Sequence, residues 1–220
     1  MRPEAGVTRR SLLAVFGIVA GGLTIGSLSE CTTSTTDSTW LTPPTTAAAL
    51  FAPFGATIKA HFHATGAQVY TCTVSSTSGG GPGGGGSATP ASPPYGWVLK
   101  GPDAQLFDEA GAVVGRHSVG PTWASSLDGS SVVGTKVAQS TAPRAGAVPW
   151  LLLRASSTSG AGVFSTVTFI QRVETVGGVA PPDGCDAHAV GSETRSDYSA
   201  DYFFYEGGSS PNDAAAGTPG

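Results

Sequence analysis

The sequence predicts an all-β fold, either a single antiparallel β-sandwich or a closed β-barrel domain with long loops. Charged residues make up 12% of the 220 residues, about half the usual share of ~25%, and the 32 glycines are about twice the usual number. Such a composition disfavours long amphipathic helices. The apolar residues come in short runs rich in Val, Ile, Phe, Trp and Tyr, separated by Gly, Pro, Ser, Asp and Asn, which is typical of strands joined by turns. The number and spacing of these runs fit a sandwich and a barrel equally.

Residues 1–30 are interpreted as an export signal and are left out of the fold. Arg9 and Arg10 precede an apolar, glycine-containing stretch that ends before Cys31, and this arginine pair resembles the twin-arginine type. The alternative is a retained membrane anchor helix. Glycines interrupt the stretch, however, and it is shorter than the ~20 apolar residues that a span needs. The signal predicts a periplasmic, cell-surface or secreted protein.

A Thr/Ser-rich tether is expected over residues 31–53, ahead of the β domain. Cys31 at its start is a candidate for lipidation, because Leu28 and Ser29 precede it as in a lipoprotein signal. Glu30 argues against lipidation, since the residue before a modified cysteine is normally small. Both interpretations stay open, and a lipid anchor at Cys31 is the only membrane attachment expected.

The β domain is expected over residues 54–206, with a flexible Gly-rich loop at residues 75–94 and a disordered polar tail at 207–220. Turn signals at residues 108–111, 128–129 and 177–178 separate several of the apolar runs. Ten strands are predicted, at residues 57–63, 68–74, 96–100, 104–108, 113–117, 122–124, 131–136, 150–155, 163–175 and 198–205. This is enough chain for one substantial core.

Three cysteines, Cys31, Cys72 and Cys185, occur in a chain that is expected to leave the reducing cytosol. With Cys31 lipidated or in the tether, Cys72 and Cys185 remain as a disulfide pair that would close a long loop. A metal site is the weaker alternative, because the sequence has no C-x-x-C and neither cysteine has a histidine at ligand spacing.

A series of sequence blocks resembles a known family. In chain order the blocks are GAQVYTC (66–72), GRHSVGPTW (115–123), DGS (128–130), VPWLLL (148–153), QRVETVGG (171–178), APP (180–182), Cys185 and DYSADYFFY (197–205). Together they resemble a domain-of-unknown-function family of small secreted fungal and exported bacterial proteins. The resemblance implies fold and export and brings no activity with it, although some fungal members are labelled malate dehydrogenase.

The dehydrogenase label disagrees with the sequence. Residues 79–84 match G-x-G-x-x-G, but they contain Pro82, open no predicted helix and are followed by no βαβ unit. NAD-dependent malate dehydrogenase activity is therefore rejected, and no cofactor is expected. The sequence also has no G-x-S-x-G, H-E-x-x-H or Walker motif. A net charge of −4 without a basic cluster argues against a nucleic-acid partner.

His61 and His63 are weak candidates for metal ligands. They lie two residues apart on a predicted strand, so both side chains project from one face. Two such imidazoles can bind one metal ion, with His117 or His188 completing the site. The preferred interpretation is a polar, solvent-facing strand face, and no metal is predicted.

The segment at residues 115–130 is where we expect any function to reside, because loops on a β scaffold commonly carry function. Its notable residues are His117, Trp123, Asp128 and Ser130. Their side chains are expected to gather at one end of the scaffold, where Trp97 and Trp123 would line a ligand groove beside His117. The structural alternative is that Trp123 plugs the barrel while His117 bonds a turn carbonyl. Arg172 and Glu174, alternate residues of one predicted strand, are interpreted as a surface pair.

The predicted function is an exported, extracytoplasmic binding or surface module whose partner is a small molecule or a cell-envelope component. The alternative is a hydrolytic or metal-dependent extracytoplasmic enzyme that uses His117 with Asp128 or Ser130. A binding module should show a groove lined by aromatic side chains. An enzyme should hold His117 within hydrogen-bond reach of a carboxylate or hydroxyl inside a cleft.

Overall fold

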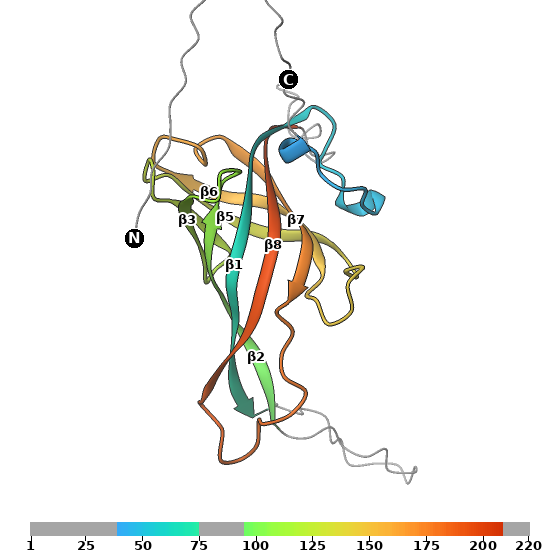
Figure 1. Cartoon of the computed structure of the whole chain (residues 1–220), viewed down its shortest axis with the longest axis vertical. Helices are drawn as coiled ribbons and strands as arrows, with labels where there is room; N and C mark the ends of the chain where they lie inside the picture. The colour runs from blue at the N-terminus through green and yellow to red at the C-terminus, as the bar shows by residue number, and fades with distance from the viewer. Residues whose placement is uncertain (1–38, 75–94, 209–220) are drawn as a thin grey trace, which may run out of the picture. The chain divides into compact units, whose positions relative to one another are not determined.

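The computed structural model describes residues 39–74 and 95–208, and these form a closed barrel of antiparallel strands (Figure 1). Each strand pairs with the next one along the chain, and β1 also pairs with β8, which closes the ring. The strands are β1 (Ala56–Val74), β2 (Tyr95–Phe107), β3 (Val113–Ser118), β4 (Thr122–Ser125), β5 (Ser131–Ser140), β6 (Trp150–Ser159), β7 (Val167–Gly177) and β8 (Glu193–Gly207). The all-β prediction is confirmed, and of the two predicted architectures the barrel is the one formed.

Two short 3-10 turns, η1 (Thr39–Leu41) and η2 (Ala48–Leu50), precede the barrel. Among residues 39–74 and 95–208, no helix has the length and apolar character needed to cross a membrane. The expected signal at residues 1–30, the start of the tether with Cys31, the loop at 75–94 and the tail from residue 209 lie outside the described residues. The predictions made for those segments stay predictions.

Eight strands form where ten were predicted, because two pairs of predicted strands are continuous. β1 runs unbroken through Gly66, where a break was expected. A Cβ atom on Gly66 would lie 2.3 Å from the carbonyl oxygen of Asp103 on β2, so this glycine permits a close approach of two backbones instead of a turn. β2 continues through Gly101, beside a shift in the register with β1. β7 begins later than predicted, because residues 160–166 form bends and turns.

Strand residues alternate between the inside and the outside of the barrel, and both faces bury apolar side chains. The inner core includes Trp123, Phe164, Tyr202 and Phe204, all at most 1% exposed. The outer cluster includes Leu50, Trp150, Leu152, Phe169, Val173, Phe203 and Tyr205. β8 therefore contributes successive aromatic residues to opposite cores.

Residues 39–53, which the sequence assigned to the tether, pack on the outer face of the barrel. Leu50 is fully buried there, and the Nε2 of Gln171 donates a hydrogen bond of 2.8 Å to its carbonyl oxygen. Trp40 packs against His61 with ring centroids 4.1 Å apart. The packed part of the chain thus begins earlier than predicted. A few apolar residues in a polar segment are enough to attach it to an exposed apolar sheet face.

The two ends of the barrel differ. The β2–β3, β4–β5 and β6–β7 connections lie at one end, and the β3–β4, β5–β6 and β7–β8 connections lie at the other, because neighbouring strands are antiparallel. Phe164, which is fully buried, closes the first end from the β6–β7 connection. Past the second end, β1, β2 and β8 continue as a three-stranded extension, here called the arm (residues 69–74, 95–101 and 193–196; Figure 1).

Candidate functional site

A pocket of about 300 Å³ opens at the second end of the barrel, from which the arm extends. Its buried and half-buried lining comes from seven of the strands: Gln68, Pro102, His117, Trp123, Leu151, Leu153, Arg172 and Tyr202. Its exposed lining is Leu99, Pro121, Lys136, Gln139 and Pro149. The volume lies at the lower end of the range for small-molecule sites, ~300–1,000 Å³. Two residues predicted for binding, His117 and Trp123, therefore share this pocket.

His117 lines the pocket as a neutral imidazole. Its ring stacks on Trp123, with centroids 4.3 Å apart and planes inclined by 5°, and the residue is 2% exposed. Burial lowers the pKa of His117 to about 3, against a smaller raising effect of its hydrogen bond to Thr122. The carbonyl oxygen of Thr122 can only accept, so Nδ1 carries the proton and donates to it across 3.0 Å. Nε2 is consequently an acceptor.

Two buried donors in the pocket lining have no hydrogen-bond partner among the described residues. They are the amide Nε2 of Gln68 and the indole Nε1 of Trp123, and both side chains are 1% exposed. A buried donor without an acceptor costs ~1–3 kcal/mol, so buried polar groups are nearly always paired in native proteins. An acceptor atom that enters the pocket would satisfy these two groups.

The charged side chains that line the pocket are Arg172 and Lys136, and both are cationic. The Nε and one terminal nitrogen of Arg172 donate to the carbonyl oxygen of Pro149 across 3.1 and 2.7 Å, which holds the guanidinium at the lining. The Nζ of Lys136 donates to the side-chain oxygen of Gln139 across 2.8 Å. The carbonyl oxygen and the amide oxygen that accept these hydrogen bonds are uncharged, so they do not neutralise the positive charge of Arg172 or of Lys136.

Tyr202 supplies a hydroxyl group to the same pocket. It lies 2.5 Å from the hydroxyl of Tyr198, and either oxygen can be the donor of that hydrogen bond. Burial raises the pKa of Tyr202, and it raises the pKa of Tyr198 well above the ordinary value. Both phenols are therefore neutral and serve as hydrogen-bonding groups.

Arg172 was expected to form a surface pair with Glu174, and that expectation is wrong. The register between β7 and β8 shifts between Val173 and Val176, and Glu174 has a positive φ of 49°. The irregularity breaks the alternation on which the expectation rested. Arg172 lines the barrel pocket, whereas Glu174 lies in the outer surface beside Trp150.

Asp128 and Ser130 lie at the opposite, closed end of the barrel. Asp128 accepts hydrogen bonds from the hydroxyl and amide of Ser130 (2.6 and 2.9 Å) and from the amide of Val163 (2.9 Å). The Ser130 hydroxyl oxygen accepts from the amide of Phe164 (3.1 Å). These bonds hold the pKa of the Asp128 carboxyl well below its usual value and tie two connections together. The expectation that both residues gather with His117 is wrong. His117 lies next to the β3–β4 connection, whereas Asp128 and Ser130 lie in the β4–β5 connection, at the other end of strand β4.

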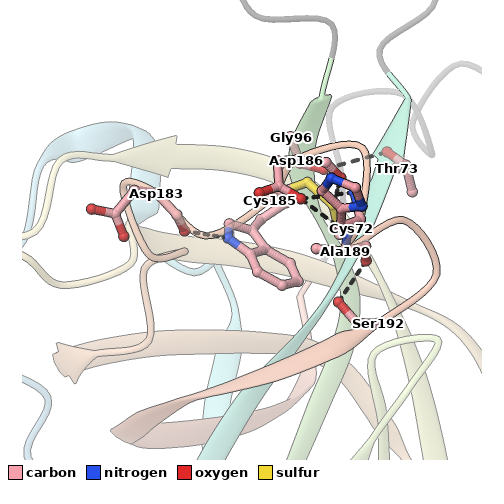
Figure 2. The surroundings of a disulfide bond; sticks show 10 residues. Cys72, Thr73, Gly96, Asp183, Cys185, Asp186, Ala189 and Ser192 are labelled. Carbon is pink, nitrogen blue, oxygen red and sulfur yellow. Dashed lines mark hydrogen bonds between the residues drawn. A yellow bond between two sulfur atoms is a disulfide. The ribbon is translucent and has the colours of Figure 1, made fainter.

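The arm carries the predicted disulfide. Cys72 of β1 is bonded to Cys185 in the β7–β8 connection, with Cα atoms 5.4 Å apart (Figure 2). Trp97 pairs across the strands with Cys72, and its Nε1 donates to the carbonyl oxygen of Asp183 across 2.8 Å. Trp97 thus fastens the same connection as the disulfide. It is not among the residues that line the barrel pocket, where it had been expected beside Trp123.

His61 and His63 share the outer face of β1 and meet Asp201 of β8. The Nδ1 of His63 lies 2.8 Å and the Nε2 of His61 lies 3.4 Å from the same carboxylate oxygen. The hydrogen bond to Asp201 raises the pKa of His63. Burial raises the pKa of Asp201, but interactions with the two histidines outweigh it and lower the pKa to about 2. The described residues contain no group of three or more His, Cys, Asp or Glu placed to hold a metal ion.

His61 itself is part of an aromatic stack. Its ring lies between Trp40 and Phe203, with both centroid distances 4.1 Å, and its Nδ1 is 2.5 Å from the carbonyl oxygen of Trp40. The indole of Trp40 donates in return to the carbonyl oxygen of His61 across 3.2 Å. These contacts make His61 an attachment point for residues 39–53.

Comparison with known proteins identifies one related group. Residues 53–206 match a family model described as "Protein of unknown function (DUF3455)". The match spans more than half of the chain and confirms the resemblance to a domain-of-unknown-function family that the ordered sequence blocks indicated. No curated protein and no solved structure matches the chain.

Proposed function

The chain belongs to the DUF3455 family of proteins of unknown function, and we propose that it is a binding module that holds a small molecule in the barrel pocket. One observation carries the proposal: two buried donors, on Gln68 and Trp123, line this pocket without partners among the described residues. Apolar walls beside a few convergent polar groups are the usual composition of a small-molecule site. The pocket combines both.

The geometry favours binding over the hydrolytic alternative. A general base works best with a pKa near the working pH, whereas burial lowers the pKa of His117 to about 3. Its Nδ1 donates to a backbone carbonyl oxygen and not to a carboxylate. Asp128 and Ser130, the partners that the enzyme alternative requires, bond to each other at the closed end. The residues around the pocket recognise a ligand, and we assign them no part in bond cleavage.

We also propose that the protein works outside the cytosol. The disulfide between Cys72 and Cys185 supports this, because disulfides persist in oxidising compartments. The paired Arg9 and Arg10 support a twin-arginine route. Replacing both arginines with lysine should leave the precursor in the cytoplasm, as measured by cell fractionation. Export at the wild-type level would contradict this route.

Binding can be tested with anilinonaphthalene sulfonate, an anionic aromatic probe that fluoresces strongly when its rings enter an apolar pocket. We expect saturable binding at one site of the full chain. Leu151→Trp adds a ring to a half-buried pocket residue and should abolish the signal by filling the space. The matched control is Leu127→Trp, the same change at a residue that is 74% exposed and lies at the closed end.

The control variant should bind the probe as the wild type does. If Leu151→Trp still binds the probe with wild-type affinity while it remains folded, the pocket is not the binding site. The absence of saturable binding to the wild-type chain would contradict the proposal directly.

A further inference from the structure

We infer that the pocket selects an anionic ligand, a small molecule that carries a carboxylate or similar oxyanion on a flat apolar body. This inference rests on the proposed function and adds the chemical class of the ligand. It follows from three properties of the lining: the sign of its charges, the two buried donors that have no partner among the described residues, and the shape of its apolar walls.

The charges come first. Arg172 and Lys136 line the pocket, and no Asp or Glu is among the described residues that line it. The chain as a whole has a net charge of −4, so the two positive charges of the described lining are a local exception to its composition. A guanidinium presents a planar set of N–H donors that matches a carboxylate, and Arg is the usual residue at sites that bind carboxylates.

The position of Arg172 directs its charge into the pocket. In the sheet it is paired with Leu151 of β6 on one side and with Tyr202 of β8 on the other, and both of these residues line the pocket. The positive charge of Arg172 lowers the pKa of His117. It also lowers the pKa of Tyr202, against the larger raising effect of burial, so its field reaches the buried lining. Pro149 holds the guanidinium in place through two hydrogen bonds and leaves its charge unneutralised.

Two of the remaining polar groups are buried donors without a partner. The Nε2 of Gln68 and the Nε1 of Trp123 are buried and have no acceptor among the described residues. An indole N–H can only donate, so the group that satisfies Trp123 must carry a lone pair. A carboxylate offers about four lone-pair positions on two oxygens and accepts from several donors at once. One oxyanion can therefore serve the guanidinium and an unpaired donor together.

The apolar walls set the shape of the ligand. The indole of Trp123 is stacked on the ring of His117, and Leu151 and Leu153 complete an apolar lining. Gly134 keeps space for the indole, since a Cβ atom there would lie 3.1 Å from its ring. A cavity of about 300 Å³ beside a planar aromatic wall fits a ligand of one or two rings.

The test compares two probes of the same shape, naphthoate and its neutral amide, naphthamide. Isothermal titration calorimetry on the full chain should show naphthoate binding at least about tenfold more tightly at low salt. Raising the ionic strength to about 1 M, where the Debye length is ~3 Å, should weaken naphthoate binding and leave naphthamide binding unchanged.

Arg172→Met should lower the affinity for naphthoate about tenfold or more and change the affinity for naphthamide less than about twofold. The matched control is Arg195→Met, which removes an exposed arginine of the arm that is paired with Asp103 and should change neither affinity. Lys136→Met provides a second variant, because Lys136 is exposed and its removal should not affect folding. It should weaken naphthoate binding alone.

Equal affinities for naphthoate and naphthamide, both lost in Leu151→Trp, would overturn the inference of an anionic ligand and leave pocket binding standing. Binding of neither compound to the wild-type chain would overturn both the inference and the proposed function. Unequal affinities that survive both Arg172→Met and Lys136→Met would also overturn the inference, because the charge would then be recognised elsewhere.

Discussion

Mild acidification should destabilise this protein through one buried histidine before its carboxylates are protonated. His117 is 2% exposed, stacks on Trp123 and uses its one ring proton in a bond to a backbone carbonyl. A second proton would place a positive charge in the barrel interior, close to Arg172. The folded protein therefore keeps this imidazole neutral, with its pKa lowered to about 3 from an ordinary value of 6.5.

The magnitude follows from that difference in pKa. Between pH 6.5 and about 3 the unfolded chain binds a proton on His117 and the folded chain does not, so the unfolded state binds more protons and stability falls as pH falls. The stability present above pH 6.5 is lost progressively toward pH 3. Each pH unit corresponds to about 1.4 kcal/mol, so the loss reaches roughly 2 kcal/mol at about pH 5. For a domain of this size the melting temperature should fall by about 4–8 °C.

His63 works in the opposite direction. Its pKa is raised by Asp201, so its contribution to stability is fully present below pH 6.5 and is lost as pH rises through the raised pKa. Wild-type stability alone therefore mixes two histidine effects of opposite sign. The effect of His117 must be isolated by comparison with a variant.

The assay is urea unfolding followed by far-UV circular dichroism at several pH values between about 7.5 and 5. His117→Gln should be less stable than the wild type at about pH 7.5, because the stacked ring is lost, but it should lose roughly 2 kcal/mol less on acidification. His188→Gln, at an exposed position in the β7–β8 connection, is the control and should follow the wild type. If the wild type and His117→Gln lose the same free energy between these pH values, the reasoning from burial is refuted.

Three further outcomes are expected. Replacing both Cys72 and Cys185 by Ala should lower the free energy of unfolding by about 5 kcal/mol in urea titrations, because the disulfide spans a sequence separation of 113 residues. A loss below about 1 kcal/mol would contradict the chain-entropy account of this stabilisation. Gly66→Ala should cost about 1–3 kcal/mol in a thermal melt, since its Cβ atom would collide with the backbone of β2, and an unchanged melting temperature would show that the strands can separate there. Trp40→Ala should make residues 39–53 sensitive to limited proteolysis while the barrel stays intact, because the stack on His61 is lost; wild-type resistance to cleavage would show that other contacts hold this segment.

The fold class was predictable because it depends on composition and on turn residues, which are local properties. Two features of the fold were not. Gly66 looks like the end of a strand in the sequence, yet it lies inside a long one because the neighbouring backbone approaches it closely. Leu50 lies in a segment that the sequence assigns to a tether, yet it is fully buried against an outer sheet face. Both depend on a tertiary neighbour that no local pattern contains.

The candidate site was predicted in part. His117 and Trp123 were selected from their block of sequence, and they line the pocket together. Gln68 and Lys136 were missed, because each is an ordinary polar residue on a predicted strand. No local signal marks Gln68: it lies between apolar residues, so strict alternation with the apolar side chains inward would place it outside. Arg172 was assigned to the surface because its pairing with Glu174 assumed unbroken alternation, and the irregularity at Glu174 ends that alternation.

The arm has a consequence for self-association. Closing a sheet into a ring satisfies the backbone of every strand on both sides, but β3 pairs with β2 only from Ala104 onward, so residues 95–101 of β2 have no neighbouring strand on that side in the described part of the chain. Val98 and Leu99 are about half exposed along this edge. Such an edge is a template for strand addition from another molecule. Lys100 interrupts the apolar run with a charge, and Pro102 ends the stretch with a residue that has no amide hydrogen to donate. Both are devices by which edge strands avoid joining one another, so these two residues protect the one stretch of the described sheet that lacks a neighbouring strand on that side.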